Sequence, residues 1–465
     1  MLRRLISIFC LLLILAWSGS ARANLGENIG FGSRSAGLAG IAATEAAEAY
    51  SAYGNPAALA PATEGKRLRF SLGLTYLNPD FFSIDNVVLE NNYVSDKATP
   101  RYGSVDTDVR STLGQTVGVT YTLPGEKKIS VGATAFVPLA QLAYLDSGEA
   151  FAPEYVLHRS RTQRPQIETA VSFEPWSGVS LGVGAHLAYS LTTNASVFLQ
   201  SDSSKPSSLR LGASLKPVLS PNFGIHIQNS PTFSFGSVLR FPARSATTVN
   251  LYSAVRLTSF LPALDVNFLG TGALFYDPLS LESATAWEYA PGLRLLFQLD
   301  YQAWSRFESP ALRVEQPTVA NCQGGPCGSG FTVSPSQNPS YTFRDIWVPR
   351  IGHEWKNGDW TWRGGYFYRP TILSGITTSS GPGNYLDPSR HAFTFGAGVE
   401  FDSLMSLEAP WRLDFHGSYQ ALVGETIVKS AGNEVGNLAD VKIGSPGYVA
   451  GGKIWGGGVS LNLAL

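Results

Sequence analysis

Apolar and polar residues alternate along many short segments of this chain. In 179–187 the odd positions are Val, Leu, Val, Ala and Leu, and the even positions are Ser, Gly, Gly and His. Because successive side chains of a strand point to opposite faces, such a segment has one apolar face and one polar or glycine face. The same alternation recurs in 293–301, 393–401, 411–419 and 459–465. It predicts an all-β fold, a transmembrane antiparallel β-barrel with lipid outside and water or a ligand inside.

The breaks between these segments predict the number of strands. Six short turns lie at 124–127, 176–178, 229–231, 290–292, 357–359 and 404–410, and long polar stretches separate them. Short turns at one end and long loops at the other are typical of outer-membrane barrels. Six turns join twelve strands, and a first and a last strand bring the expected total to 14. The section 244–290 is ambiguous, because 251–276 can be a folded loop or another hairpin, which would make 16.

The N-terminus has the pattern of an export signal. Arg3 and Arg4 precede an apolar run over 5–17, and the small-residue triplet 21–23 follows it. The run is too short to span a bilayer as a helix, so residues 1–23 are expected to be a cleaved signal peptide, with a retained anchor as the alternative. No later stretch has the 18 consecutive apolar residues of a helical span. An exported soluble protein or a membrane barrel remains, and the strand pattern favours the barrel.

Composition supports a bacterial outer-membrane location. Charged residues make up 15% of the chain and aromatic residues 12%, whereas about 25% charged residues is normal for soluble proteins. The 48 glycines suit strands with a slim inner face. The formal net charge of −1 leaves no basic footprint for a nucleic acid. The expected partners are therefore outer-membrane lipid, including lipopolysaccharide, and a small molecule.

Residues 24–65 lack the strand pattern and are rich in Ala and Gly. Thr44 can cap a short helix with Glu45 and Glu48 in its first turn, and 54–56 would end it. A segment of small residues with short helices cannot build a core of its own. We expect it to be a plug inside the lumen of a barrel formed by residues 66–465. A disordered periplasmic leader is the alternative.

Four motifs follow one another along nearly the whole chain. They are GSRSAGLAG at 32–40 with YGNPAAL at 53–59, LDYQAWSRF at 299–307, DIWVPRIGHEW at 345–355 leading to RGGY at 363–366, and YLDPSRH at 385–391. Together they resemble motifs of the FadL-like outer-membrane transporters, which carry long-chain fatty acids and aromatic hydrocarbons. The resemblance implies a monomeric 14-stranded barrel with an N-terminal plug. It also implies ligand capture at the outer loops and lateral release where the third strand kinks inward.

The resemblance reaches individual residues at two places. Asn55, Pro56 and Ala57 match the plug triplet of the family, which implies a latch that holds the plug in the wall; an Asn-Pro turn that ends a helix is the alternative. The third strand should be 129–138, where Gly132 and Pro138 permit a kink because they weaken a strand ladder. The alternative for Gly132 is an ordinary inward-facing glycine, since glycine is common on inner barrel faces. No cofactor is expected, because the ligand would move down its own gradient.

The first outer loop is unusually apolar. It contains Phe81, Phe82, Val87, Val88 and Leu89. These side chains are candidates for ligand contact, and the alternative is that they pack over the barrel mouth.

Cys322 and Cys327 lie in a predicted outer loop. In an oxidising compartment a disulfide between them would persist. A redox or metal site is the alternative, although their spacing is not that of a Cys-x-x-Cys motif and no group of histidines lies nearby.

Enzymatic chemistry has little support in the sequence. Residues 178–182 fit the Gly-x-Ser-x-Gly pattern, but Ser180 lies within an unbroken strand pattern and not on the strand-to-helix turn that a nucleophile needs. The six histidines are scattered, with no pair at metal-ligand spacing, and His186 and His416 should face inward. We therefore expect no enzyme and no metal site. A general diffusion porin, a structural barrel and a membrane-embedded acyl hydrolase remain as alternatives to a channel for hydrophobic compounds.

Overall fold

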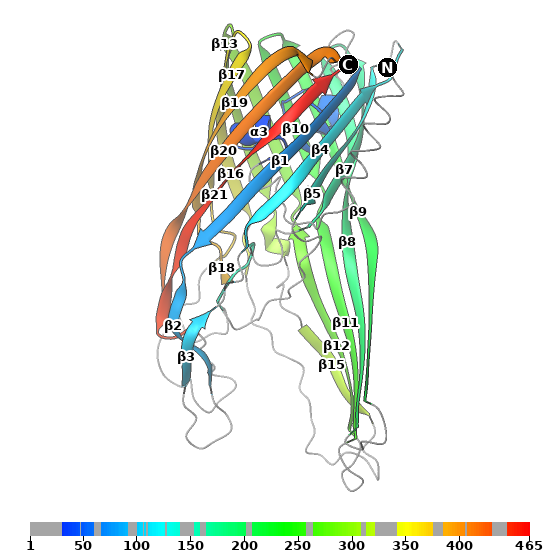
Figure 1. Ribbon diagram of the computed structural model, residues 1–465, viewed down its shortest axis with the longest axis vertical. Coiled ribbons are helices and arrows are strands. Elements are labelled where there is room, and N and C mark those ends of the chain that lie inside the picture. The colour runs from blue at the N-terminus through cyan, green and yellow to red at the C-terminus, as the bar shows by residue number, and fades with distance from the viewer. Residues whose placement is uncertain are drawn as a thin grey trace.

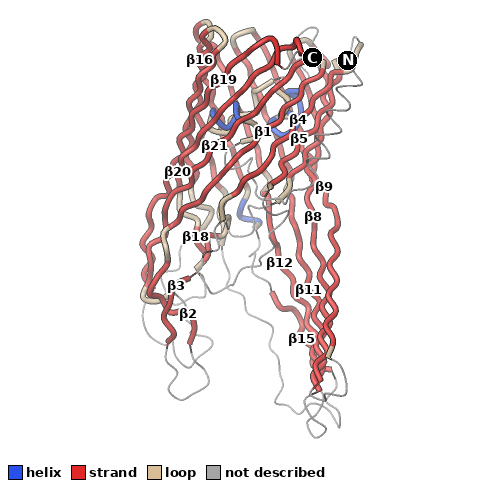
Figure 2. The backbone as a smooth tube through the Cα atoms, viewed as in Figure 1, coloured by secondary structure: helices blue, strands red, loops and turns tan. Residues whose placement is uncertain are grey.

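The computed structural model describes residues 30–46, 48–59, 67–91, 100–105, 107, 110–125, 128–139, 153–158, 164–200, 207–256, 264–307, 313–320, 342–374, 385–404, 407–429 and 444–465. Strand dominates these residues, as Figure 2 shows. Within these ranges, no helix is both long and apolar enough to cross a membrane.

Fourteen antiparallel strands close into a transmembrane barrel (Figure 1). Each pairs with the next strand of the wall, and β21 pairs with β1 from Ala464↔Arg69 to Gly452↔Phe81, which closes the ring. The expected number of 14 strands is confirmed. The wall strands in order are β1 (Leu68–Phe81), β4 (Thr112–Thr122), β5 (Ile129–Pro138), β7 (Gln166–Trp176), β8 (Val179–Gln200), β9 (Ser208–Ser230), β10 (Phe233–Arg240), β13 (Ser280–Ala290), β14 (Leu293–Gln302), β16 (Ile346–Asn357), β17 (Trp360–Arg369), β19 (Arg390–Leu404), β20 (Leu407–Val428) and β21 (Gly447–Ala464).

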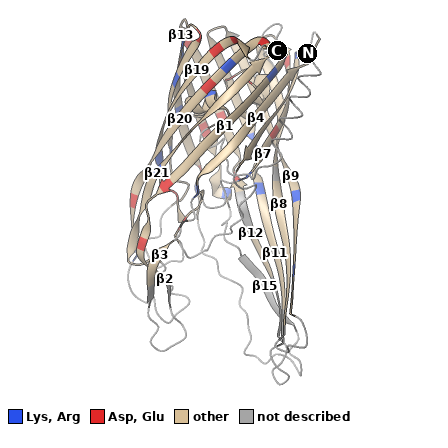
Figure 3. Cartoon of the chain, in the orientation of Figure 1, with Lys and Arg blue, Asp and Glu red and all other residues tan. Residues whose placement is uncertain are grey.

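The alternation of the sequence matches the two faces of the wall. Val183 and Phe297 point outward and are 52% and 48% exposed, whereas Ser180 and Gln298 point inward and are 3% and 5% exposed. The outward face is the one that lipid would cover. Charged positions are sparse along the strands, as Figure 3 shows.

The ambiguous section forms a hairpin that is not part of the wall. β11 (Ala243–Arg256) and β12 (Leu264–Asp277) pair with each other, and β11 pairs in parallel with the outer part of β8, from Thr247↔Leu191 to Arg256↔Gln200. β15 (Arg313–Ala320) adds to β12. The 16-stranded alternative is therefore wrong. The reason is that β8 continues past Leu187, where its pairing with β7 ends, so β8 offers a free edge to the hairpin.

These strands form a projecting sheet, which we define as 191–200 of β8, 208–219 of β9, β11, β12 and β15. Figure 1 shows it extending beyond the rest of the barrel. Leu209, Leu211 and Leu215 lie on one face and are 61–66% exposed. Arg210 and Lys216 lie on the other face, so the alternation of the wall continues into the projection.

Outer segments pack over the barrel mouth. β2 (Ile84–Asn91) pairs with β3 (Pro100–Val105), and β6 (Glu154–Tyr155) pairs in parallel with β18 (Tyr385–Leu386). Val87 is fully buried in a cluster with Ile427 of β20 and Tyr448 of β21. The first outer loop therefore packs over the mouth in part, which matches the alternative interpretation for Val87.

The N-terminal segment, residues 30–46 and 48–59, lies inside the barrel. It contains α3 (Ser33–Gly37), α4 (Ser51–Gly54) and the short 3₁₀ helix η2 (Pro56–Leu59), which contact strands from β4 round to β21. The helix expected from Thr44 is wrong, because the described residues of 41–50 form turns and α4 begins only at Ser51. Glu45 and Glu48 are instead held by arginines, which overrides the local capping preference. The end of the helix before Asn55 is confirmed.

Candidate functional site in the lumen

An ionic cluster joins the N-terminal segment to the wall near the end with the short turns. Its charges balance, and its members lie on the segment and on β14, β16, β17 and β20. They are Arg34, Glu45 and Glu48 from the segment, and Arg294, Glu354, Arg363, Arg412 and Asp414 from the wall.

Arg34 is the central link of the ionic cluster. Its Nη1 lies 2.6 Å from Glu48 Oε1, and its Nη2 lies 2.7 Å from Glu45 Oε2 and 3.0 Å from Glu354 Oε1. Arg412 reaches Glu48 from the wall at 2.6 Å. Buried charges are tolerated when each has an opposite partner, and removing one partner leaves the other uncompensated. The cluster therefore ties the segment to four strands at once.

The charges of this cluster act on Glu48. Burial alone would raise the pKa of its carboxyl group, but the positive charges of Arg412 and Arg34 outweigh burial and lower the pKa to about 2. The carboxylate thus stays ionised through the whole neutral and mildly acidic range.

The triplet at 55–57 contacts the wall directly. Asn55 is fully buried, and its Nδ2 donates to Ile225 O of β9 at 3.0 Å and to Ala43 O at 2.8 Å. Its Oδ1 accepts from the backbone N–H of Ala57 at 2.9 Å. One side chain therefore joins two parts of the segment to the wall.

A pair of glycines makes this close approach possible. Gly182 of β8 and Gly224 of β9 face each other across the ladder. A Cβ at Gly182 would overlap the backbone of Pro56, and a Cβ at Gly224 would overlap the side-chain oxygen of Asn55. The triplet therefore lies directly against the backbone of the wall, at two glycines that have no side chain to keep it away.

Two wall arginines bind backbone carbonyls of the segment. Arg350 Nη1 donates to Ala39 O at 2.7 Å, and its Nε donates to Asp300 at 2.6 Å. Arg240 donates to the carbonyl oxygens of residues 53 and 54, and its guanidinium lies 4.8 Å from the ring centroid of Tyr53. Asp300 lies on β14, Arg350 on β16 and Arg240 on β10, so three strands of the wall take part in holding the segment.

A polar cavity of about 80 Å³ lies beside Tyr53, between the segment and β7, β8, β9, β10, β13, β14 and β16. His186 Nδ1 lies 2.7 Å from Glu168 Oε1, and Asn222 Nδ2 donates to Glu168 Oε2 at 3.1 Å. We call this space the polar cavity. The expectation that His186 faces inward is confirmed. Ser180 also faces inward, but it is the second residue of β8 and follows a turn, so the expected mid-strand position is wrong.

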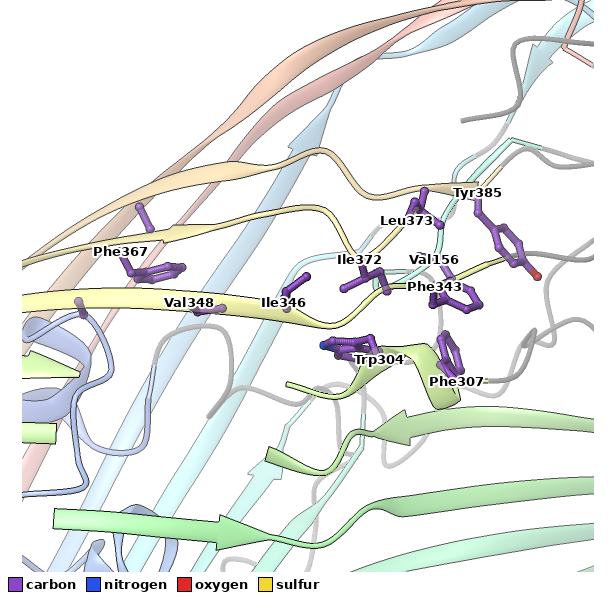
Figure 4. Packing of buried hydrophobic residues seen from close by; sticks show 12 residues of the cluster. Val156, Trp304, Phe307, Phe343, Ile346, Val348, Phe367, Ile372, Leu373 and Tyr385 are labelled. Atoms are coloured by element: carbon purple, nitrogen blue, oxygen red, sulfur yellow. The ribbon is translucent and has the colours of Figure 1, made fainter. Parts of the chain in front are cut away.

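Apolar side chains pack together on the side of the outer loops (Figure 4). This outer apolar cluster comprises Ala39, Val156, Trp304, Phe307, Phe343, Ile346, Val348, Phe367, Ile372, Leu373, Tyr385 and Ala392. Asp387 beside it accepts from Arg369 and from the N–H of Ile372. Burial, with the nearby charges of Arg390 and Arg369, holds the pKa of His158 well below its usual range. The outer layer thus combines packed apolar groups with internally paired polar ones.

The third strand has the expected bounds, Ile129–Pro138. A Cβ at Gly132 would lie 2.7 Å from Leu59 of η2, so this glycine faces the segment. Pairing of β5 with β7 ends at Phe136, whereas pairing with β4 continues to Pro138. The outer end of β5 is therefore an edge on one side.

The other predicted residues have different outcomes. Phe81 packs against Tyr155 with ring centroids 4.1 Å apart, and Phe82 is 50% exposed. The side chain of Leu89 and both Cys322 and Cys327 lie outside the described residues, so the ligand contact of Leu89 and the disulfide stay predictions. Among the side chains that the structure does describe, no group of three or more His, Cys, Asp or Glu can hold a metal ion.

The ionic cluster was not predicted from the sequence. A signal existed, because Arg294, Glu354, Arg412 and Asp414 occupy inward positions by strand parity in a chain with few charges. Their partners Arg34 and Glu48 come from a segment more than 240 residues away, as the separation of 249 positions between Glu45 and Arg294 illustrates.

The sequence matches no family model, and no curated protein matches it. Solved structures do resemble it in three dimensions. A FadL homologue from Pseudomonas aeruginosa has a TM-score of 0.56 at 15% identity, over 93% of this chain and 98% of the other. The toluene transporter TodX from P. putida has 0.52 at 13%, over 94% and 99%. The toluene transporter TbuX from Ralstonia pickettii has 0.50 at 12%, over 94% and 99%.

These features define the class of the protein: a closed 14-stranded transmembrane β-barrel whose lumen contains its own N-terminal segment. The strand number alone does not define a fold family, because barrels of the same size serve several functions. The similarity of nearly the whole chain to the solved structures is more specific than the strand number. The fold is that of the FadL-like outer-membrane transporters.

Proposed function

We propose that the protein is an outer-membrane channel for the passive uptake of hydrophobic compounds, long-chain fatty acids or hydrocarbons. The observation that carries the proposal is the N-terminal segment, which lies inside a barrel with an apolar outer face and is held there by polar bonds. The segment acts as the plug, and Asn55, Pro56 and Ala57 act as its latch. Solved structures of the same fold include toluene transporters, which supports this class of solute.

The proposed route uses the edge of the third strand. A hydrophobic compound is captured among the outer loops, passes the plug and leaves sideways where β5 has lost its pairing with β7 beyond Phe136. Lateral exit keeps the compound out of water, which lowers the free energy of the path for an apolar solute. Residues 1–23 direct export, the barrel lies in the bacterial outer membrane among lipid and lipopolysaccharide, and no chemical step or cofactor takes part.

A general diffusion porin is the rival. A porin needs a water-filled lumen, and the buried N-terminal segment with the outer apolar cluster argues against one. A hydrolase would need a nucleophile at a strand-to-helix turn, and Ser180 follows a turn that joins two strands, β7 and β8.

Uptake of labelled oleate and labelled toluene tests the proposal. Cells that express the chain are compared with cells that express Arg412→Gln, which removes a partner of Glu48, and with the control Asn250→Leu in the projecting sheet. We expect cells with the unaltered chain to take up at least one compound. The rate of uptake should change in Arg412→Gln and stay the same in the control. A fully assembled barrel that takes up neither compound would refute the channel function for both classes.

A further inference from the structure

The polar cavity has unused hydrogen-bonding groups. Four side-chain atoms of its lining have no protein partner: Gln166 Oε1, His186 Nε2, Asn222 Oδ1 and Arg240 Nη1. Gln166 and Asn222 are only 2% and 1% exposed. Buried polar atoms are costly when unpaired, and native structures contain few of them. A gathering of four at one cavity indicates a polar group that binds there.

The hydrogen bonds within the lining determine whether each remaining atom is a donor or an acceptor. Asn222 Nδ2 donates to the Glu168 carboxylate, so its free Oδ1 is an acceptor. His186 Nδ1 lies 2.7 Å from the same carboxylate and donates to it, so Nε2 is the ring nitrogen without a hydrogen-bond partner. Arg240 Nη1 is a donor. The cavity therefore offers acceptors and a donor together, which matches a hydroxyl or an amide group.

Charge argues against an anionic head group. Four carboxylates line the polar cavity, whereas its two arginines are already committed: Arg240 to Glu282 at 2.8 Å and Arg350 to Asp300 at 2.6 Å. The other two are Glu168 and Asp277, with His186 Nε2 lying 3.8 Å from Asp277. A carboxylate only accepts hydrogen bonds, so it cannot pair with Asn222 Oδ1.

The lining of the polar cavity includes two residues that are also exposed on the outer surface of the barrel. Phe241 and Pro221 are part of its lining, and both are exposed, Phe241 by 40%. β10 ends at Arg240, and the Phe241 ring pairs with the lipid-facing Phe223 at 6.0 Å between centroids. An alkyl chain can lie against these rings while its head group occupies the polar cavity.

We propose that the polar cavity binds the uncharged hydroxyl or amide head group of an amphiphile, whose alkyl chain passes Phe241 towards the membrane. Gln166, His186, Asn222 and Arg240 supply the hydrogen bonds. This inference goes beyond the proposed function, because it adds uncharged amphiphiles as a class of ligand beside fatty acids and hydrocarbons. The place of access, where β9, β10 and β11 meet, differs from the edge of the third strand.

Three probes with the same chain length isolate the head group: dodecane, 1-dodecanol and dodecanoate. Binding of each labelled probe is measured to the purified full-length barrel in nanodiscs, with empty nanodiscs subtracted. We expect 1-dodecanol to bind about tenfold more tightly than dodecanoate, because a lost or mismatched buried hydrogen bond changes affinity by about that factor.

Variants then locate the effect. Asn222→Leu and Gln166→Leu should each weaken 1-dodecanol binding about three- to tenfold and leave dodecane unchanged. Thr134→Val is the matched control, because Thr134 is a buried inward-facing polar residue on β5 that does not line the polar cavity. Phe241→Ser should weaken all three probes alike, and the exposed Phe297→Ser should weaken none. Heat-modifiability on gels verifies that each barrel is folded.

The outcomes separate this inference from the proposed function. Equal binding of the three probes, or 1-dodecanol binding that Asn222→Leu and Gln166→Leu leave unchanged in folded barrels, overturns the head-group site, including the case in which only water occupies the cavity. If cells take up oleate or toluene in spite of this result, the channel function stands. If 1-dodecanol binds as expected while cells take up neither compound, the site stands and the channel function fails.

Discussion

Replacing Asn55 with Leu should release the N-terminal segment from the wall. Leu has the same number of side-chain heavy atoms as Asn, branched at the same carbon, so the substitution removes hydrogen bonds without opening a cavity. Three bonds are lost: two donated by Nδ2, to Ile225 O and Ala43 O, and one accepted by Oδ1 from Ala57. Because Asn55 is fully buried, water does not replace them while the segment stays docked.

The magnitude follows from these three bonds. One bond joins Asn55 to the wall and two lie within the segment, which cannot keep its fold alone, so all three are lost on undocking. A buried hydrogen bond between neutral groups contributes about 1 kcal/mol net, so the docked state should lose about 3 kcal/mol relative to an unfolded, undocked segment. Since 1.4 kcal/mol corresponds to a factor of ten, the undocked population should rise about a hundredfold. The closed ladder of the wall does not depend on this side chain, so barrel assembly should be unaffected.

Cysteine labelling measures the undocked population. A reporter Ala52→Cys is fully buried in α4, and Cys322→Ser with Cys327→Ser removes competing thiols. The rate of maleimide labelling should rise about a hundredfold in Asn55→Leu, because labelling requires opening. Asn250→Leu is the matched control, since it removes a 2.8 Å bond to Asn194 in the projecting sheet. Equal labelling rates in the two Leu variants would refute the argument.

Three further predictions use the same barrel. Gly224→Val should expel the triplet from its patch and speed labelling of the reporter, whereas Gly212→Val, whose nearest neighbouring atom is 4.0 Å from a new Cβ, should not. Val183→Arg on the lipid face should lower the free energy of unfolding in urea by about 2–4 kcal/mol, and Ser214→Arg on the exposed polar face of the projection should leave it unchanged. The lowered pKa of Glu48 means that its stabilisation is complete above pH 4.5 and is lost towards pH 2. Reporter labelling, divided at each pH by the labelling rate of the urea-unfolded chain to correct for the thiolate fraction, should therefore be constant from pH 7 to 5 and rise below 4.5. A rise above pH 5 would contradict this assignment.

The wall could be predicted because its rules are local. Strand parity places Val183 outside and Ser180 inside, and each short turn identifies two neighbouring strands without any long-range knowledge. The β11–β12 hairpin shows the limit of this reasoning. Its alternation is that of a wall strand, and only the pairing of Thr247 with Leu191, 56 positions away, places it on β8. Nothing within 243–277 distinguishes a hairpin in the wall from one beside it.

The site was harder to predict because its bonds join distant parts of the chain. Parity identifies Arg412 and Glu354 as inward-facing, but it does not say that Arg34 and Glu48 meet them. The same distant bonds explain the error at Thr44, since local capping is worth about 1 kcal/mol and the ionic cluster engages Glu48 twice. The triplet at 55–57 was found from its motif, whereas its glycine patch on the wall needed the register of β8 with β9.

The kind of bond that holds the N-terminal segment bears on its proposed movement. Ala, Gly and Ser make up much of the segment, but Phe31, Leu38, Ile41, Tyr50 and Leu59 are large and buried, so undocking exposes apolar surface as well. Its polar bonds to Arg350, Arg240 and β9 can be exchanged for bonds to water at a net cost of about 1 kcal/mol each. Each large apolar side chain costs about 2 kcal/mol when it is exposed. A solute that releases the segment along the proposed route would therefore have to cover these apolar side chains as well as displace the polar bonds.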